Sequence, residues 1–297
     1  MALSQAAQPG GHAVQLHPID WLFIVGYCAV AFGIGVYFAR RASRNISEFF
    51  IAGRTLPWWL AGTSIVATTF AADTPLAVSG FARGGGIYAN WFWWSALMGG
   101  MLCVFFYARL WRRADVITDV EFIELRYEGR PASALRGFMA VYGGVLQNCI
   151  VMGWVMLAMT KICEVMLGWD KVLTIAVLMV IALGYTVLSG FWGVVMTDFL
   201  QFIMAMTGSI ALAGIVLYKM GGPAAMIEQV QAAPDFDPKL FHFTPDFATA
   251  GKLALITFIV QISIQWWGGG QGGGYLAQRL FATRSEKDSA LAALWFN

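Results

Sequence analysis

The sequence predicts an all-α integral membrane protein, and two observations carry that prediction. Hydrophobic residues make up 59% of the 297 residues, charged residues make up 12%, and the mean hydropathy is +0.65. A soluble globular domain carries roughly 25% charged residues, so this composition is typical of a chain surrounded by lipid. The apolar residues also fall into runs of about 20, the length that a helix needs to cross the hydrocarbon core.

The apolar runs divide the chain into a short tail and one membrane domain. Residues 1–18 form a polar N-terminal tail, and residues 19–297 form the membrane domain. Membrane-spanning helices are expected near residues 19–39, 57–82, 87–108, 133–160, 171–189, 193–218 and 251–270, with an eighth beginning near Ser289. No polar tail follows the final LAALWFN, so we expect the sequence to stop early in that eighth span.

The basic residues predict the orientation. If the N-terminus lies outside, thirteen of the 19 lysines and arginines fall in connections that face the cytoplasm. Cytoplasmic loops of membrane proteins carry such an excess. An external N-terminus is therefore expected, with the protein in the cell (inner) membrane.

Composition and spacing argue against other classes of protein. The net charge is +2, and no basic cluster alternates with aromatics, so no nucleic-acid partner is expected. The four cysteines lie within or at the ends of apolar runs and form no CxxC, which favours packing. The three histidines have no partner at ligand spacing, so no metal site other than one for sodium is expected. No nucleophile, base and orienting group occur at a useful spacing, so an enzyme is not expected.

The second span is interrupted by FAADTPLAVSG, residues 70–80. Pro75 removes one helical hydrogen bond and clashes with the carbonyl of Ala71. Asp73 places a carboxylate in the span, at a cost of about 2.5–3.5 kcal/mol on insertion scales. Such residues usually face a pathway. The alternative is that Pro75 only kinks the helix, with Asp73 protonated or paired for structural reasons.

The seventh span ends in a second interruption, QWWGGGQGGGYLAQR, residues 265–279. Six glycines in seven residues cannot hold a straight helix. The glycines happen to match G-x-G-x-x-G, but an apolar helix rather than a strand precedes them, so a dinucleotide site is rejected. The alternatives are a flexible loop for the glycines and interfacial anchoring for Trp266 and Trp267.

The two interruptions occupy corresponding places in two halves of the chain. Transporters built from repeats carry broken helices at matching positions, and solute and ion bind there. Five spans separate the two breaks, which is the spacing of an inverted five-helix repeat. Residues 57–218 would form the first repeat and residues 251–297 the start of the second.

Four stretches in order resemble the solute:sodium symporter family. They are SEFFIAGRTLPWWLAGTSIVATTFAADTPLAVSG (47–80), ITDVEFIELRYEGR, YTVLSGFWGVVMTDFLQF (185–202) and YLAQRLFATRSEKDSALAALW (275–295). The resemblance covers nearly the whole sequence. It implies the leucine-transporter-like fold, with one extra helix before the first repeat and with the second repeat truncated.

The resemblance also implies an ion site. In that family, a sodium ion is held by backbone carbonyls at the first break and by hydroxyls from a later helix. Carried over, the carbonyls belong to Ala67 and Phe70, and the hydroxyls would lie beyond Asn297. Asp198 matches the family's Thr-Asp aspartate, which lines the cytoplasmic ion route. The alternative for Asp198 is a residue at a helix start near the inner surface, placed favourably against the helix dipole.

The solute contacts follow from the same comparison of motifs. Thr74 matches a sugar-contacting position of the family and Trp93 roughly matches another, while Asp73 lies beside Thr74. The remaining expected solute contacts are on the seventh span: Gln265, Trp266 and Trp267. Several positions expected to bind sugar hydroxyls are aromatic or glycine here, so the solute class stays open.

The resulting hypothesis is sodium-coupled secondary active uptake of a small organic solute by alternating access. The alternative is a solute-sensing membrane domain of a signalling protein. An uncoupled pore is a third possibility, but broken helices rather than a ring of carbonyls or charges argue against it.

Overall fold

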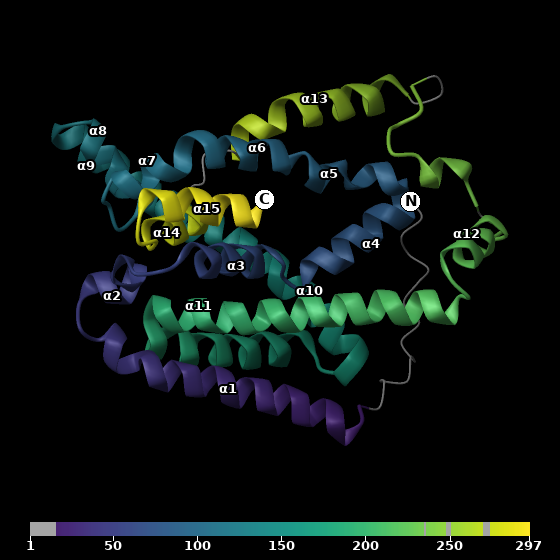
Figure 1. The fold of residues 1–297 in the computed structure, drawn as a ribbon, viewed down its shortest axis with the longest axis horizontal. Helices are drawn as coiled ribbons and strands as arrows, with labels where there is room; N and C mark the ends of the chain where they lie inside the picture. Colours follow the sequence, from purple (N-terminus) through teal and green to yellow (C-terminus); the bar gives the residue numbers. More distant parts are fainter. Residues whose placement is uncertain (1–15, 235, 248–250, 270–273) are drawn as a thin grey trace.

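The structure is a computed structural model that describes residues 16–234, 236–247, 251–269 and 274–297, with side chains for all of these except 265–269. The described residues are mainly helical, and their one β-bridge joins Leu56 to Thr283. Figure 1 shows the helices in the order of the chain. The helices are α1 Pro18–Ala42, α2 Ile46–Ile51, α3 Trp58–Thr69, α4 Asp73–Gly85, α5 Trp91–Trp94, α6 Ala96–Leu102, α7 Ala108–Arg113, α8 Phe122–Arg126, α9 Gly129–Val141, α10 Asn148–Leu167, α11 Lys171–Lys219, α12 Pro223–Gln231, α13 Lys252–Gly269, α14 Tyr275–Phe281 and α15 Glu286–Phe296.

Several of these helices are suited to a bilayer. Within the described chain, four helical stretches are long and apolar enough to cross a membrane, namely 18–42, 87–113, 129–167 and 171–219. The bent pair α3 and α4 would make a fifth span. The stretches 87–113 and 129–167 each contain a π-helical segment, Cys103–Tyr107 and Tyr142–Gln147, without ending the helix. Large apolar side chains are exposed along all of these stretches, as a lipid-facing surface requires.

The break expected in the second span lies between α3 and α4, which are bent by 58°. Phe70 leaves helical geometry with φ −98° and ψ 79°. Pro75 occupies the third position of α4, where its missing N–H would have had no partner within the helix. The chain therefore unwinds just before the proline rather than at it.

Gly190 turns α11 into a hairpin. Its φ of 57° and ψ of −163° lie in a region that side chains other than glycine rarely adopt. Figure 1 shows the two arms side by side, and they cover the segments expected as two spans, 171–189 and 193–218. A Cβ on Gly190 would lie 2.8 Å from the Cβ of Ala42 and 3.2 Å from the carbonyl oxygen of Phe49. Helix α1 packs along this hairpin.

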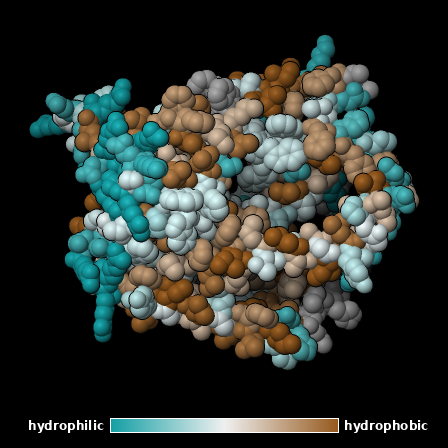
Figure 2. Space-filling view, viewed as in Figure 1, coloured by the Kyte–Doolittle hydropathy of each residue, from teal (hydrophilic) through white to brown (hydrophobic). Residues whose placement is uncertain are grey.

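A cluster of buried hydrophobic side chains in the described chain lies where α3, α7, α14 and α15 meet. Its buried side chains include Ile65, Leu280 and Ala292. The segment before α3 is tied to the segment after α14, because Leu56 N–H donates to Ala282 O and Arg284 N–H donates to Leu56 O, each at 3.0 Å. Helix α15 starts at Glu286, close to the eighth span expected from Ser289. Figure 2 shows hydrophilic residues gathered at one end of the molecule, where Figure 1 places α2, α8 and α9.

Candidate functional site

A cavity of about 590 Å³ opens at the break between α3 and α4. The chain around the break forms one wall, and the second arm of α11 forms the opposite wall. Its lining is mostly apolar, with four polar side chains from three elements: Thr68, Asp198, Gln201 and Arg279. In Figure 2 the molecule is hollowed to the right of centre, in the region where Figure 1 places α4 and the second arm of α11.

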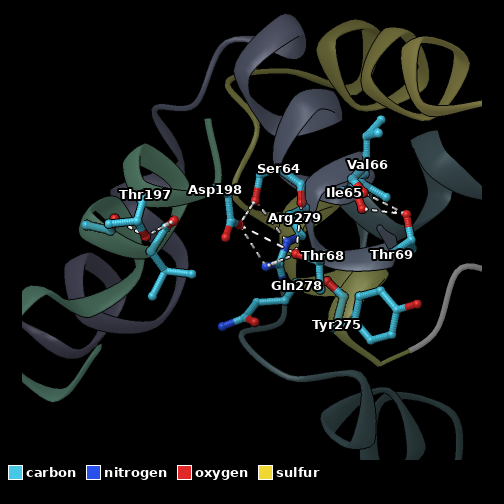
Figure 3. Close-up of polar contacts among 12 residues, drawn as sticks. Ser64, Ile65, Val66, Thr68, Thr69, Thr197, Asp198, Tyr275, Gln278 and Arg279 are labelled. Carbon is cyan, nitrogen blue, oxygen red and sulfur yellow. Dashed lines mark hydrogen bonds and ion pairs between the residues drawn. The ribbon is translucent and has the colours of Figure 1, made fainter. Parts of the chain in front are cut away.

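A buried ion pair joins Asp198 of α11 to Arg279 of α14 at one edge of this cavity (Figure 3). Arg279 Nη2 lies 3.2 Å from Asp198 Oδ2, and the two residues are 5% and 8% exposed. Ser64 Oγ donates to the same carboxylate oxygen at 2.5 Å. Thr68 Oγ1 lies 3.5 Å from it.

The guanidinium of Arg279 is held on several sides. Its Nε donates to Ser64 Oγ at 3.1 Å, and its Nη2 donates to Thr68 Oγ1 at 2.8 Å. Its Nη1 donates to the carbonyl of Tyr275, one turn earlier in α14. Ser64 and Thr68 can both contribute because residues four apart lie on the same face of a helix. Three helices distant in sequence therefore contribute to one fully paired charge cluster, as buried charges require.

Arg279 lies within the short helix α14 and is buried. Asp198 follows Gly190 by eight residues, about two turns of helix. It therefore lies beyond the first helical turn, and its partner is a guanidinium rather than a helix terminus.

The two carbonyls expected to hold sodium lie at the break. Ala67 and Phe70 both line the cavity. Phe70 N–H donates to Val66 O at 2.9 Å, and the next backbone bond is from Thr74 N–H to Ala71 O at 3.2 Å. Within this described stretch, no backbone N–H donates to the carbonyl of Ala67 or of Phe70. Hard cations bind to such oxygen ligands.

Asp73 and Thr74 make contacts across and along the break. Asp73 Oδ2 accepts a hydrogen bond of 2.7 Å from the indole Nε1 of Trp154 on α10. Thr74 Oγ1 donates to the carbonyl of Thr69 at 3.3 Å, which satisfies a carbonyl at the end of α3. Asp73 is therefore tied to a neighbouring helix, whereas Thr74 bridges the two halves of its own broken span.

The other expected solute contacts are less defined. Trp93 lies on α5, and its buried Nε1 has no hydrogen-bond partner among the described residues. Gln265, Trp266 and Trp267 belong to α13, but their side chains lie outside the described part of the structure.

Comparison with known proteins agrees with the fold and with the motifs. The family model described as "Sodium:solute symporter family" matches residues 49–295. The chain belongs to the sodium:solute symporter family. The match includes both elements of the broken span, the Asp198 arm and Arg279.

Two curated relatives illustrate the similarity. A sodium/glucose cotransporter of Vibrio parahaemolyticus is 24% identical over 280 residues, which cover 91% of this chain and 50% of that protein. Sodium/glucose cotransporter 4 of Danio rerio is 25% identical over 219 residues, covering 73% of this chain and 33% of that protein. The chain thus spans between a third and a half of the length of these relatives.

A solved structure of a Na+-coupled sialic acid symporter, in a substrate-bound outward-open state, supports the same fold for this member of the sodium:solute symporter family. It aligns with a TM-score of 0.77 at 20% identity, covering 94% of this chain and 56% of that chain. The all-α, leucine-transporter-like membrane fold expected from the sequence is confirmed.

Three members of the charge cluster, Ser64, Thr68 and Arg279, were not predicted as site residues from the sequence. Two features of the sequence could have indicated them. Gln278 and Arg279 lie together in the fourth family motif, and Ser64 and Thr68 lie four residues apart in the first motif.

Proposed function

We propose that the protein couples the inward movement of sodium to the uptake of a small organic solute by alternating access. The observation that carries the proposal is the unwound chain between α3 and α4, which leaves the carbonyls of Ala67 and Phe70 at the cavity without backbone partners. Broken helices at membrane depth supply such oxygens to transported ions. The sodium-coupled relatives make sodium the expected ion for this site.

Asp198 is proposed to serve the ion after it leaves the carbonyls. Its carboxylate lines the same cavity but is already paired with Arg279. A sodium ion that approaches it would compete with the guanidinium for the same oxygen. Release of Arg279 would then accompany passage of the ion towards the cytoplasm.

The energy available from one sodium ion is sufficient for accumulation of a solute. A membrane potential of about 100 mV contributes about 2.3 kcal/mol per charge. Because about 1.4 kcal/mol corresponds to a factor of ten, one sodium per solute supports roughly 50-fold accumulation. A concentration gradient of sodium adds to this.

The proposed orientation puts the N-terminus outside the cell (inner) membrane. The arginines near the ends of α1, α7 and α14 lie close together at one end of the molecule. Arg41 and Arg284 both bond to Thr55, and Arg112 donates to the carbonyl of Thr283 at 2.8 Å. The positive-inside rule assigns this end to the cytoplasm.

Uptake into proteoliposomes tests the proposal. A panel of radiolabelled solutes would be offered with sodium gradients and potassium-diffusion potentials of either sign. We expect uptake of at least one solute to require external sodium and to rise with an inside-negative potential. Asp73→Asn should reduce this uptake sharply, whereas Phe70→Leu should retain it because the proposed ligand is a backbone carbonyl.

Glu164→Gln is the matched control for Asp73→Asn, since it neutralises an exposed carboxylate on α10 that pairs with Lys161. It should leave uptake unchanged. Solute flux that ignores sodium and potential, in protein that remains folded, would contradict the proposal and favour an uncoupled pore.

A further inference from the structure

Two aspartates, Asp198 and Asp73, lie beside the broken span, and their side chains have different kinds of partner. Asp198 has an internal cation, Arg279, at 3.2 Å. Asp73 has a neutral partner, the indole N–H of Trp154 at 2.7 Å. None of the ion pairs formed by the described residues includes Asp73.

The helix that carries Asp73 does not place a cation beside its carboxyl group. The basic residue of its own helix, Arg83, follows ten residues later, which is about 15 Å along the axis. Asp73 is the first residue of α4, where the helix dipole favours an anion but amounts to only about half a unit charge. A charge at membrane depth normally pairs with a second charge. The carboxyl group of Asp73 therefore has no cationic partner among the described residues.

Trp154 adds an aromatic surface to the carboxylate. Its indole N–H points to Asp73 Oδ2, while 60% of the residue is exposed. Figure 1 shows the start of α4 beside α10, so the two side chains come from different helices that meet at the break. A carboxylate beside an indole face is the chemistry that binds ammonium groups, by ion pairing and by cation–π attraction.

We infer that the transported solute carries a positively charged nitrogen, and that Asp73 and Trp154 bind it. This inference rests on the proposed function and narrows its solute class to primary or substituted ammonium compounds. Sodium would occupy the carbonyls of Ala67 and Phe70, and the ammonium group would occupy Asp73. The sodium ion, the ammonium group and the guanidinium of Arg279 would then each bind to separate oxygen atoms.

The solute charge can be tested with pairs of probes that differ in charge but little in shape. Choline would be compared with 3,3-dimethylbutan-1-ol, and 2-phenylethylamine with 2-phenylethanol. Thermal unfolding of the full chain in detergent would be recorded with each probe, with and without sodium. We expect the ammonium member of at least one pair to stabilise the wild-type protein in sodium, and its uncharged isostere to have little effect.

Variants then assign the effect to the two residues. Asp73→Asn should weaken binding of the ammonium probe by about tenfold to a hundredfold, the value of one charge-assisted contact. Trp154→Phe keeps an aromatic ring and should weaken it less than Trp154→Leu does. Asp73→Glu keeps the charge and should preserve the preference for ammonium, which covers the case in which the asparagine variant fails to fold. Glu164→Gln serves again as the matched control.

The outcomes separate this inference from the proposed function. Sodium-induced stabilisation of the wild type without any preference for ammonium probes would overturn the inference and leave symport intact. Equal stabilisation by both members of each pair, or ammonium binding that survives in a folded Asp73→Asn variant, would also overturn it. Loss of the sodium response together with sodium-independent uptake would instead count against symport itself.

Discussion

The guanidinium of Arg279 on α14 and the carboxylate of Asp198 on α11 form an ion pair of 3.2 Å, although the two residues are 81 positions apart in the sequence. Both groups are nearly inaccessible, and both also contact Ser64. The pair therefore joins the second arm of α11 to α3 and α14. Its integrity should matter for folding as well as for transport.

Removing one partner of this pair should be strongly destabilising. Arg279→Met leaves the Asp198 carboxylate buried without its cation, which costs about 3–5 kcal/mol in comparable sites. The double variant Asp198→Asn with Arg279→Met should lose less stability than Arg279→Met alone, because no unpaired charge remains. Chemical unfolding in detergent micelles measures both.

Lys161→Met provides the matched control for Arg279→Met. Lys161 pairs with Glu164 at 2.9 Å on an exposed surface, with side chains 66% and 61% exposed. Such pairs contribute about 0–1 kcal/mol. If Arg279→Met and Lys161→Met proved equally mild, the buried pair would have no structural importance.

Gly190→Ala should disrupt the α11 hairpin. The substitution places a Cβ 2.8 Å from Ala42 and forces a side chain into φ 57°, ψ −163°, a strain of about 1–3 kcal/mol before any clash is counted. Gly208→Ala is the control on the second arm, where a Cβ meets nothing within 4 Å. Because alanine is the better helix former by about 0.5–1 kcal/mol, that variant should be neutral or slightly stabilised. A drop in unfolding midpoint common to both variants would argue against the hairpin explanation.

The sequence predicted the broken span but not the charge cluster around Asp198. Composition and run lengths led to the helical membrane fold, and Pro75 marked the broken span, because these signals are local. The break itself lies at Phe70, since a proline is tolerated in the first turn of the helix that follows it. The partner of Asp198 could not be predicted from local pattern. Arg279 follows a glycine-rich segment of the sequence, which is typical of a loop. Its position beside α11 results from tertiary packing, which the local sequence does not indicate.

The exposed pair Arg113 and Glu286 should give a small stability effect that depends on pH. Hydrogen bonds from Arg113, at 2.7 and 3.0 Å, lower the pKa of the Glu286 carboxyl below its usual value. A folded-state pKa below the unfolded value of about 4.3 contributes stability above that pH. The contribution is lost as the pH falls through the folded pKa.

Thermal unfolding at low ionic strength between pH 6 and pH 3, roughly spanning that unfolded pKa, would measure this loss. The wild type should lose slightly more stability on acidification than Arg113→Gln does, and salt should remove the difference. Identical acid profiles for the two proteins at low salt would show that the contact is not maintained in solution.

Gly62→Ala should separate α3 from α15. A Cβ on Gly62 would lie 2.7 Å from Cδ1 of Trp295 and 2.8 Å from the carbonyl oxygen of Ala292, and the backbone oxygen cannot move aside as a flexible side chain can. The same contact contains the hydrogen bond of 3.0 Å from Trp295 Nε1 to Thr63 Oγ1. Overpacking of this kind costs about 1–3 kcal/mol.

Near-ultraviolet circular dichroism and tryptophan fluorescence should report the displaced indole, whereas Gly80→Ala on α4, where a Cβ meets nothing within 4 Å, should leave both signals unchanged. An unaltered tryptophan spectrum in Gly62→Ala, with wild-type stability, would mean that α3 and α15 do not approach as closely as the glycine allows.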